Sequence, residues 1–236
     1  MQDGLPSSLP ADPRRIDRAA RLIDNIWLIF DRHTPCVLID ITMRALVLNG
    51  ALTGDEGLGP AADAVDSTLV ALGWIADRIE LRDVLISYCK GCFDCWVKTP
   101  GICATRDGAG AVTRALVRSD LLVLLSPITF GGYSSELKKA LDRSIGIVSP
   151  FFTRLDGEVH HRPRYARYPA LLGIGVSEDR DPEEAQIFAR LVGRNATNFH
   201  ASAHTVCLMS RDDSPEQMRT AIGRAVTQVT ARRSAA

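Results

Sequence analysis

The sequence has no excess of charge of one sign, since 28 Lys and Arg residues stand against 28 Asp and Glu residues in a chain of 236. Proteins that bind nucleic acid through bulk positive charge need a basic excess, so this balance argues against that class. The chain also lacks a long apolar run. The most apolar stretches, residues 22–30, 121–127 and 171–176, are too short or too interrupted by charge to span a bilayer.

Two further signals are missing. The N-terminus does not show the basic start, apolar run and small-residue cleavage site of a signal peptide, so a cytoplasmic protein is predicted. No Ser/His/Asp set or pair of carboxylates stands out along the chain, so hydrolysis is not expected. We therefore nominate no acid–base residue as catalytic.

The cysteines lack the even spread of a disulfide scaffold. Two of the six are isolated, Cys36 and Cys207, while the other four fall in one short segment: Cys89, Cys92, Cys95 and Cys103. In a reducing compartment, a cluster of this kind more often serves metal, cofactor or redox chemistry than cross-linking.

Residues 1–42 differ in pattern from the rest of the chain. Residues 1–13 are polar and contain three prolines, which predicts a disordered tail, and apolar residues recur at helical spacing over 14–30. The helix could pack on the domain or on a partner subunit. A membrane-surface helix is a weaker alternative because three Asp residues interrupt its positive charge. A third alternative is that translation begins at Met43, so that residues 43–236 are the whole domain.

From Met43 onward, predicted strands alternate with predicted helices. The expected strands cover 44–49, 75–81, 120–126, 170–176 and 203–209. The expected helices cover 60–72, 108–118, 133–147, 182–195 and 215–232, and residues 150–169 read as an irregular connection rich in Arg, His and Pro. Such alternation predicts an α/β fold with a doubly wound, five-stranded parallel sheet of order 2-1-3-4-5.

The loop after the first strand, residues 49–59, is rich in glycine and leads into a helix. Free backbone N–H groups at a helix start suit a phosphate, although many such loops are glycine-rich for steric reasons only. Asp55 and Glu56 are awkward neighbours for a phosphate dianion. The candidate cofactor-binding residues here are Asn49, Gly50, Ala51, Thr53 and Gly57.

The turn after the third strand is the second candidate site. Pro127 ends the strand, and Gly131 and Gly132 let the backbone approach a planar ligand closely. The alternative is an ordinary strand–turn–helix unit in which Tyr133 packs on the fold. The candidate residues of this turn are Pro127, Ile128, Thr129, Phe130, Gly131, Gly132 and Tyr133.

The segment from Ser126 through Gly131 and Lys138 to Arg143 resembles the flavin-ring loop and following helix of the flavodoxin-like NAD(P)H-dependent FMN reductase family. The cysteine segment resembles the iron–sulfur flavoprotein branch of that family, on the residues Cys89, Gly91, Cys92, Cys95, Cys103 and Asp107. The similarity covers residues 44–143 in consistent order and is only architectural beyond Ser149.

The resemblance implies an FMN with its phosphate in the loop 49–59 and its ring against residues 127–133. The family's phosphate loop carries Gly-Ser, a basic residue and a later hydroxyl. Here Gly50-Ala51 replaces Gly-Ser, Thr53 is the only hydroxyl, and the loop has no basic residue. The phosphate is therefore held by backbone N–H groups and Thr53, or held weakly.

The cysteine spacing is C-x2-C-x2-C-x7-C, with Gly91 easing the bend and Pro100-Gly101 forming a turn before the fourth cysteine. Four converging thiolates suit a [4Fe–4S] cluster. They also suit zinc, whose ligands more often come as two separated Cys-x2-Cys pairs. The third alternative is that they remain plain thiols.

Two sets of charged residues follow these loops in the sequence. Lys138, Asp142 and Arg143 are predicted to form ion pairs facing solvent or a subunit. The Arg- and His-rich stretch 150–169 is predicted to be an exposed basic loop, with steering of an NAD(P)H phosphate or cover for the site as the alternative.

The sequence thus predicts an FMN-dependent oxidoreductase that takes electrons from NAD(P)H or a carrier and passes them to a quinone, another small molecule or a protein. The resemblance also implies a homo-oligomer. The alternatives are an electron carrier without NAD(P)H turnover and a degenerate member that no longer binds FMN.

Overall fold

The computed structural model describes residues 43–55 and 57–234, so the predictions for residues 1–42 lie outside the described part. Five strands form one parallel sheet in the order β2-β1-β3-β6-β7. Their bounds are β1 Arg44–Asn49, β2 Ile75–Glu80, β3 Leu121–Pro127, β6 Ala170–Ser177 and β7 His204–Ser210. Counted along this sheet, the order is 2-1-3-4-5, which confirms the predicted fold.

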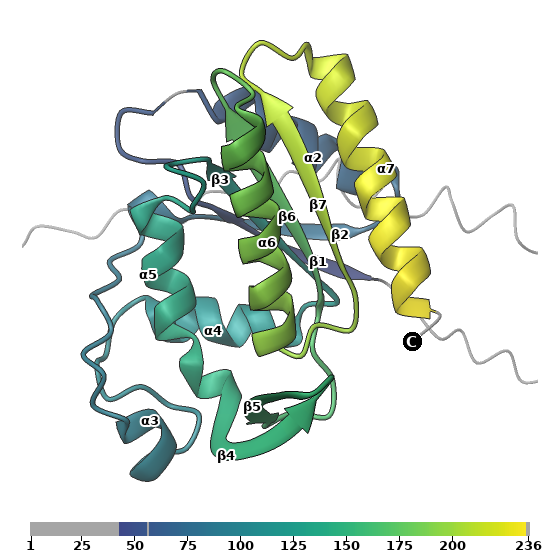
Figure 1. Ribbon diagram of the computed structural model, residues 1–236. Helices are drawn as coiled ribbons and strands as arrows, with labels where there is room; N and C mark the ends of the chain where they lie inside the picture. The colour runs from purple at the N-terminus through teal and green to yellow at the C-terminus, as the bar shows by residue number, and fades with distance from the viewer. Residues whose placement is uncertain (1–42, 56, 235–236) are drawn as a thin grey trace, which may run out of the picture. The chain divides into compact units, whose positions relative to one another are not determined.

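Helices cover both faces of the sheet (Figure 1). Alternate strand residues enter two separate cores, as the period of two along a strand requires: Val47 and Val123 belong to one, Leu46 and Leu122 to the other. The first core is closed by α2 (Gly59–Ala71) and α7 (Pro215–Ser234), the second by α4 (Ala109–Arg118), α5 (Ser135–Arg143) and α6 (Pro182–Asn198). No helix in the described part is both long and apolar enough to cross a membrane.

The predicted helix over 133–147 is partly wrong. The side chain of Ser134 accepts a hydrogen bond from the Leu137 N–H and so caps α5. The helix therefore begins at Ser135, two residues after the predicted start. The helix ends at Arg143, and a short 3₁₀ turn, Ile145–Ile147, follows. Tyr133 therefore precedes the helix and belongs to the turn before it.

The stretch 150–169, predicted to be irregular, mostly forms an antiparallel hairpin. Its strands are β4 (Val148–Leu155) and β5 (Glu158–Pro163). They are joined by Asp156-Gly157, both with positive φ, at 50° and 85°. Asp-Gly is a preferred pair for a two-residue hairpin turn, so the signal was present but masked by the Arg, His and Pro content around it.

The connection from β2 to α4 carries the cysteines. It contains a 3₁₀ turn, Leu81–Asp83, and one short helix, α3 (Asp94–Val97). Figure 1 shows this connection running beside α5 to α3, which lies at the end of the molecule occupied by β4 and β5. The loops after β1 and β3 lie instead at the carboxyl edge of the sheet, where the two strands are neighbours.

Candidate functional site

The loop after β1 is held at its first residue by the buried side chain of Asn49. Its Oδ1 accepts a hydrogen bond from the Ala51 N–H at 3.1 Å, and its Nδ2 donates to Glu80 Oε2 in β2 at 2.8 Å. Ala51 is buried as well, whereas Thr53 lies exposed at the tip of the loop. Asn49 and Ala51 therefore shape this loop, and Thr53 presents the hydroxyl.

The loop after β1 packs closely at Gly50. Its N–H donates to the Leu125 carbonyl of β3 at 2.8 Å. A Cβ at Gly50 would lie 2.7 Å from Ser134 Oγ and 2.9 Å from Leu137 Cβ. Only glycine lets the loop after β1 come this close to the start of α5, so Gly50 packs against the two elements, β3 and α5, that flank the β3 turn.

A cation that sequence reasoning missed lies beside the same loop. Arg211, in the connection between β7 and α7, pairs with both carboxylate oxygens of Asp55, each at 3.1 Å. A Cβ at Gly57 would lie 2.1 Å from Arg211 Nη1. The two residues are 156 positions apart, so only the folding of the sheet could have revealed this basic residue.

The turn after β3 is a tight reversal. Thr129 and Gly132 exchange two backbone hydrogen bonds, while Phe130 and Gly131 have φ of 48° and 73°. Positive φ at both central positions is the geometry of a type I′ turn, and glycine adopts it without strain. The turn packs on α6, because a Cβ at Gly131 would lie 2.7 Å from Ile187 Cβ. Phe130, by contrast, is 92% exposed.

The ends of this turn are fixed by buried hydrogen bonds. Ser126 Oγ accepts the Ser134 N–H at 2.9 Å and donates to the Pro127 carbonyl at 2.8 Å. The Ile128 N–H donates to Val176 in β6. The backbone that would face a flavin ring is thus positioned by β3, β6 and α5 together.

Tyr133 points into the core. Its ring packs edge-on against Phe188, and its hydroxyl accepts a hydrogen bond from Asn195 Nδ2 at 3.1 Å. Burial raises the pKa of Tyr133 to about 12, although the Asn195 hydrogen bond opposes this shift. Tyr133 therefore supports the turn from beneath, as the packing alternative expected.

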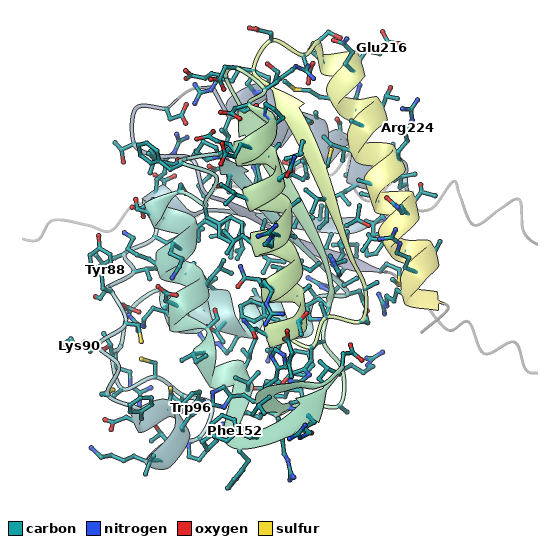
Figure 2. The ribbon with its side chains drawn as sticks, in the orientation of Figure 1. Tyr88, Lys90, Trp96, Phe152, Glu216 and Arg224 are labelled. Carbon is teal, nitrogen blue, oxygen red and sulfur yellow. The ribbon has the colours of Figure 1, made fainter. Side chains whose placement is uncertain are left out.

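The four clustered cysteines line one cavity of about 470 Å³. Its other walls come from the last turn of α5, the end of α6 and His161 of β5. Figure 2 shows Tyr88 and Lys90 along one side of the ribbon, with Trp96 and Phe152 near its lower end. Lys90 and Trp96 are among the residues that line this cavity. The structure thus brings Cys89, Cys92, Cys95 and Cys103 together, as their spacing predicted.

The four thiols influence one another electrostatically. Burial and then the neighbouring Cys103, Cys89 and Cys92 raise the pKa of the Cys95 thiol. In the described residues, however, no three Cys, His, Asp or Glu side chains are placed to share one metal ion. A single zinc ion needs sulfurs about 3.8 Å apart, from Zn–S bonds of about 2.3 Å in a tetrahedron. In the described residues the thiols are therefore not preformed around a single ion of any kind.

Both ends of the cysteine segment are tied to α5 by Arg143. This residue is buried and pairs with Asp107 at 2.8 and 3.0 Å, and it also donates to the carbonyls of Ser87 and Thr105. The expectation of an ion pair facing solvent or a subunit is wrong for Arg143. The expectation holds for Lys138 and Asp142, which form an exposed pair on the same helix.

The hairpin closes the far side of the cysteine cavity. Trp96 Nε1 donates to the Val148 carbonyl at 3.0 Å, and its ring lies 4.5 Å from the His161 ring. The Phe152 ring lies tilted against the His161 ring, with 4.8 Å between centroids. The hairpin thus covers the cysteines with an aromatic wall.

Thiol reactivity should follow this arrangement. Cys89 and Cys92 are exposed, whereas Cys207 is buried and burial raises its pKa to about 11. Because the thiolate is the reactive form, metal-free protein treated with an alkylating reagent at pH 8 should be modified first at Cys89 and Cys92 and last at Cys207. Peptide mass mapping over time gives the order. Early modification of Cys207 would contradict this packing of β7.

Comparisons with known proteins identify the family. A family model described as NADPH-dependent FMN reductase matches residues 43–164. An iron-sulfur flavoprotein of Archaeoglobus fulgidus is 28% identical over 99 residues, covering 41% of this chain and 44% of that protein. The chain matches less than half the length of the curated relatives.

Two solved structures share the fold at low identity. The NAD(P)H:quinone oxidoreductase from Methanothermobacter marburgensis has a TM-score of 0.57 at 13% identity, covering 82% of this chain and 96% of that one. An FMN-dependent NADH-azoreductase from Bacillus anthracis has a TM-score of 0.54 at 14% identity, covering 81% and 99%. Since the family model spans more than half of the sequence, the chain belongs to the NADPH-dependent FMN reductase family.

Proposed function

We propose that this protein is an FMN-dependent oxidoreductase that takes hydride from NAD(P)H and passes electrons to a quinone, another small molecule or a protein. The observation that supports this proposal is the close packing of Gly50, in the β1 loop, against the end of β3 and the start of α5, the two elements that the β3 turn joins. The two loops lie at the reversal of strand order, where open parallel sheets bind their ligands.

The residues present fit an FMN. For the phosphate end, the loop offers the hydroxyl of Thr53 and the start of α2, whose N-cap residue Leu58 makes no side-chain cap. For the ring end, the reversal at Thr129–Gly132 offers a fixed strip of backbone. FMN would supply the redox chemistry, as a group that accepts hydride and can release electrons one at a time.

The chain's own task at this site is to orient rather than to transfer protons. The turn 127–133 holds a single titratable side chain, Tyr133, which stays protonated at neutral pH with a pKa of about 12. The hydroxyl groups of Ser126 and Ser134 make their hydrogen bonds to the backbone of the turn and of the helix start that follows it. These side chains support a site that positions the cofactor and excludes water, and none of them is proposed as an acid or a base.

We further propose that Cys89, Cys92, Cys95 and Cys103 hold a [4Fe–4S] cluster, with bare thiols as the alternative. The support is the shared cavity and the effect of the three neighbouring thiols on the pKa of Cys95, together with the names of the matched iron-sulfur flavoproteins. A cubane binds each cysteine to a different iron, so its thiolates need not crowd around one ion. The donor chemistry therefore fits a cluster better than a single metal.

The cysteine cavity and the flavin turn lie at opposite ends of α5. The turn directly precedes this nine-residue helix, and the helix's last turn, with Leu141, lines the cavity. A helix of this length spans roughly 13 Å. The two candidate sites are linked by Asn195, which lines the cavity and donates to Tyr133 of the turn, but the cysteines themselves lie outside the turn and can be altered separately.

We also propose a cytoplasmic homo-oligomer. Free thiols persist in a reducing compartment, which suits the exposed Cys89 and Cys92. Phe130 is 92% exposed beside the proposed ring site, and an aromatic side chain in that position suits cover by a second copy of the chain. Light scattering during size-exclusion chromatography measures the assembly directly, and a monomer with full flavin would contradict this proposal.

The first test is the visible spectrum of anaerobically purified protein before and after dithionite, with iron, zinc and FMN quantified on the same sample. We expect two resolved flavin bands, a broad brown shoulder and about four irons per chain. Cys95→Ser should remove the iron and leave the flavin bands. Flavin without iron would exclude the cluster, and a protein that stays colourless after soaking in FMN would exclude the proposed function.

The second test separates the enzyme from an electron carrier. Purified protein with FMN should consume NADH or NADPH anaerobically and bleach the flavin bands, with turnover when a quinone is added. A carrier would keep its flavin oxidised in the presence of either nicotinamide and accept electrons only from a reductase. Boiled protein with the same FMN concentration is the control for reduction by free flavin.

A further inference from the structure

The proposed phosphate loop has an electrostatic problem that its own residues do not solve. Residues 50–58 contain no Lys or Arg but do contain Asp55. A phosphate monoester carries up to two negative charges near neutral pH, and proteins commonly meet it with a guanidinium. Any cation for this loop must come from elsewhere in the fold. Arg78 and Arg82 line a pocket with Ala51 and Asp55, but both are paired with carboxylates outside the loop.

Arg211 is the further cation that the fold brings to this loop. It follows the last residue of β7, and its backbone N–H donates to the Ser177 carbonyl of β6 at 3.0 Å, which anchors it at the carboxyl edge of the sheet. Its guanidinium then reaches across to Asp55, with Nη1 and Nη2 each 3.1 Å from a separate carboxylate oxygen. The cation is thus positioned by two strands before it meets the loop.

The Asp55 carboxylate lies where an anionic ligand would. It accepts the Gly57 N–H at 2.9 Å, immediately before α2, and the guanidinium of Arg211 on its other side. Backbone N–H groups and guanidinium groups are the two donors that anion sites use most. The chain's own carboxylate therefore occupies an anion position built from Gly57 and Arg211.

Two further observations show that this position is made for close approach. A Cβ at Gly57 would lie 2.1 Å from Arg211 Nη1, so the guanidinium lies directly against this backbone and would have to shift if Gly57 carried a side chain. Arg211 Nε makes no hydrogen bond, although its side chain is 32% exposed and Glu178 forms an ion pair with it at 3.7 Å. A guanidinium N–H that makes no hydrogen bond can still donate to an acceptor.

We propose that Arg211 is the residue that binds the FMN phosphate, and that Asp55 is an internal competitor that occupies Arg211 until the phosphate replaces it. This inference rests on the proposed function. No covalent bond is made or broken in the exchange. The Gly57 N–H and the Arg211 guanidinium donate to the phosphate oxygens instead of the Asp55 carboxylate. The basic residue absent from the β1 loop is thus supplied by the β7–α7 connection.

The competing explanation is that the Arg211–Asp55 pair only ties two loops together. FMN and riboflavin separate these explanations, because they share the ring and differ in the phosphate. If Arg211 binds the phosphate, its loss weakens FMN alone. If it only ties the loops, its loss disturbs both ligands equally.

The experiment measures dissociation constants of FMN and riboflavin for flavin-free protein by quenching of flavin fluorescence. For Arg211→Met we expect FMN affinity to fall about 10- to 100-fold, as for a lost hydrogen bond to a charged group, with riboflavin affinity unchanged within about twofold. Arg211→Lys should recover part of the loss. Asp55→Asn should tighten FMN severalfold and leave riboflavin unchanged.

The control is Arg44→Met, which removes another arginine paired with an aspartate, at the opposite edge of the sheet. It should change neither affinity. As an independent readout, inorganic phosphate should raise the melting temperature of flavin-free wild type but not that of Arg211→Met.

Equal losses for both flavins in Arg211→Met, or no loss for either, would overturn the role of Arg211. Weaker FMN binding in Asp55→Asn would overturn the competition. If wild type binds riboflavin and FMN equally, the phosphate site fails while the flavin site stands. Binding of neither flavin by wild type would remove the proposed function itself.

Discussion

Arg143→Met should lower the free energy of unfolding by about 3–5 kcal/mol, the usual effect of removing one partner of a buried ion pair. The side chains of Arg143 and Asp107 are only 1% and 4% exposed, so the variant leaves a buried carboxylate without its cation. It also frees the carbonyls of Ser87 and Thr105, one near each end of the cysteine segment. Urea unfolding followed by circular dichroism measures the change, and the melting temperature should fall by about 10 °C.

The same helix provides a matched control. Lys138 pairs with Asp142 at 2.6 Å, but both side chains are about half exposed, so Lys138→Met should change stability by about 0.5 kcal/mol or less. A large effect of Lys138→Met, or a small one of Arg143→Met, would contradict the burial that the structure assigns to the Arg143–Asp107 pair. The Arg143→Met protein should also bind less iron, because both ends of the cysteine segment lose their anchor.

The Asp107–Arg143 pair also predicts how acid affects stability. Burial would raise the pKa of the Asp107 carboxyl, but hydrogen bonds from Arg143, Ser87 and Ala109 outweigh it and lower the pKa from 3.8 to about 2. The folded state thus favours the charged form, and the stabilisation is present above pH 4 and lost as the pH falls toward 2. Wild type should lose this contribution between pH 4 and pH 2, whereas Asp107→Asn should show a flatter acid profile.

Gly50→Val should cost about 3 kcal/mol of stability and most of the affinity for FMN. A side chain at Gly50 would collide with Ser134 Oγ and Leu137 Cβ, and its Cβ would lie only 3.1 Å from the Leu125 carbonyl. These neighbours are buried, so the strain of overpacking cannot be relieved by a side chain moving into solvent. Urea unfolding gives the stability, and fluorescence titration with FMN and riboflavin gives the affinities, both of which should fall.

Gly110→Val in α4 is the control, because the only neighbour a Cβ would meet there is Arg114 Nη1, at an ordinary 3.6 Å. Stability should change by about 0.5 kcal/mol or less, and FMN affinity should not change. If Gly50→Val bound FMN as tightly as wild type, the two loops would not form one cofactor site.

Much of the fold could be predicted because the residues concerned carry strong local signals. Residues 121–127 are an apolar run with no polar face, and every residue of β3 is buried, as a central parallel strand requires. Gly73, with φ of 81°, follows α2 as the predicted stop. The hairpin was not predicted, although Asp156-Gly157 is a known turn pair. The Arg, His and Pro content of residues 150–169 suggested an irregular connection, and this outweighed the backbone preference of two residues.

Some features of the candidate site were likewise predictable from local sequence, and others were not. The residues of the β3 turn and the cysteine segment were found by spacing and by resemblance, both of which depend on residues close together in the chain. Tyr133 shows the limit: it was predicted to begin a helix and to lie against the flavin ring, but it precedes the helix and its side chain points to Asn195, 62 residues away. Which way a side chain points depends on the elements packed against it, and those are distant in sequence.

The sequence by itself thus determined the order of the five sheet strands and the helices between them, the two loops proposed to bind the cofactor and the clustering of four cysteines, because each is encoded within a short stretch. Tertiary structure alone decided that Arg211 meets Asp55, that Arg143 is buried, and that the cysteine cavity lies at the far end of α5 from the flavin turn. Charge pairs and cavities arise where distant segments pack, and no local pattern records which segments will meet.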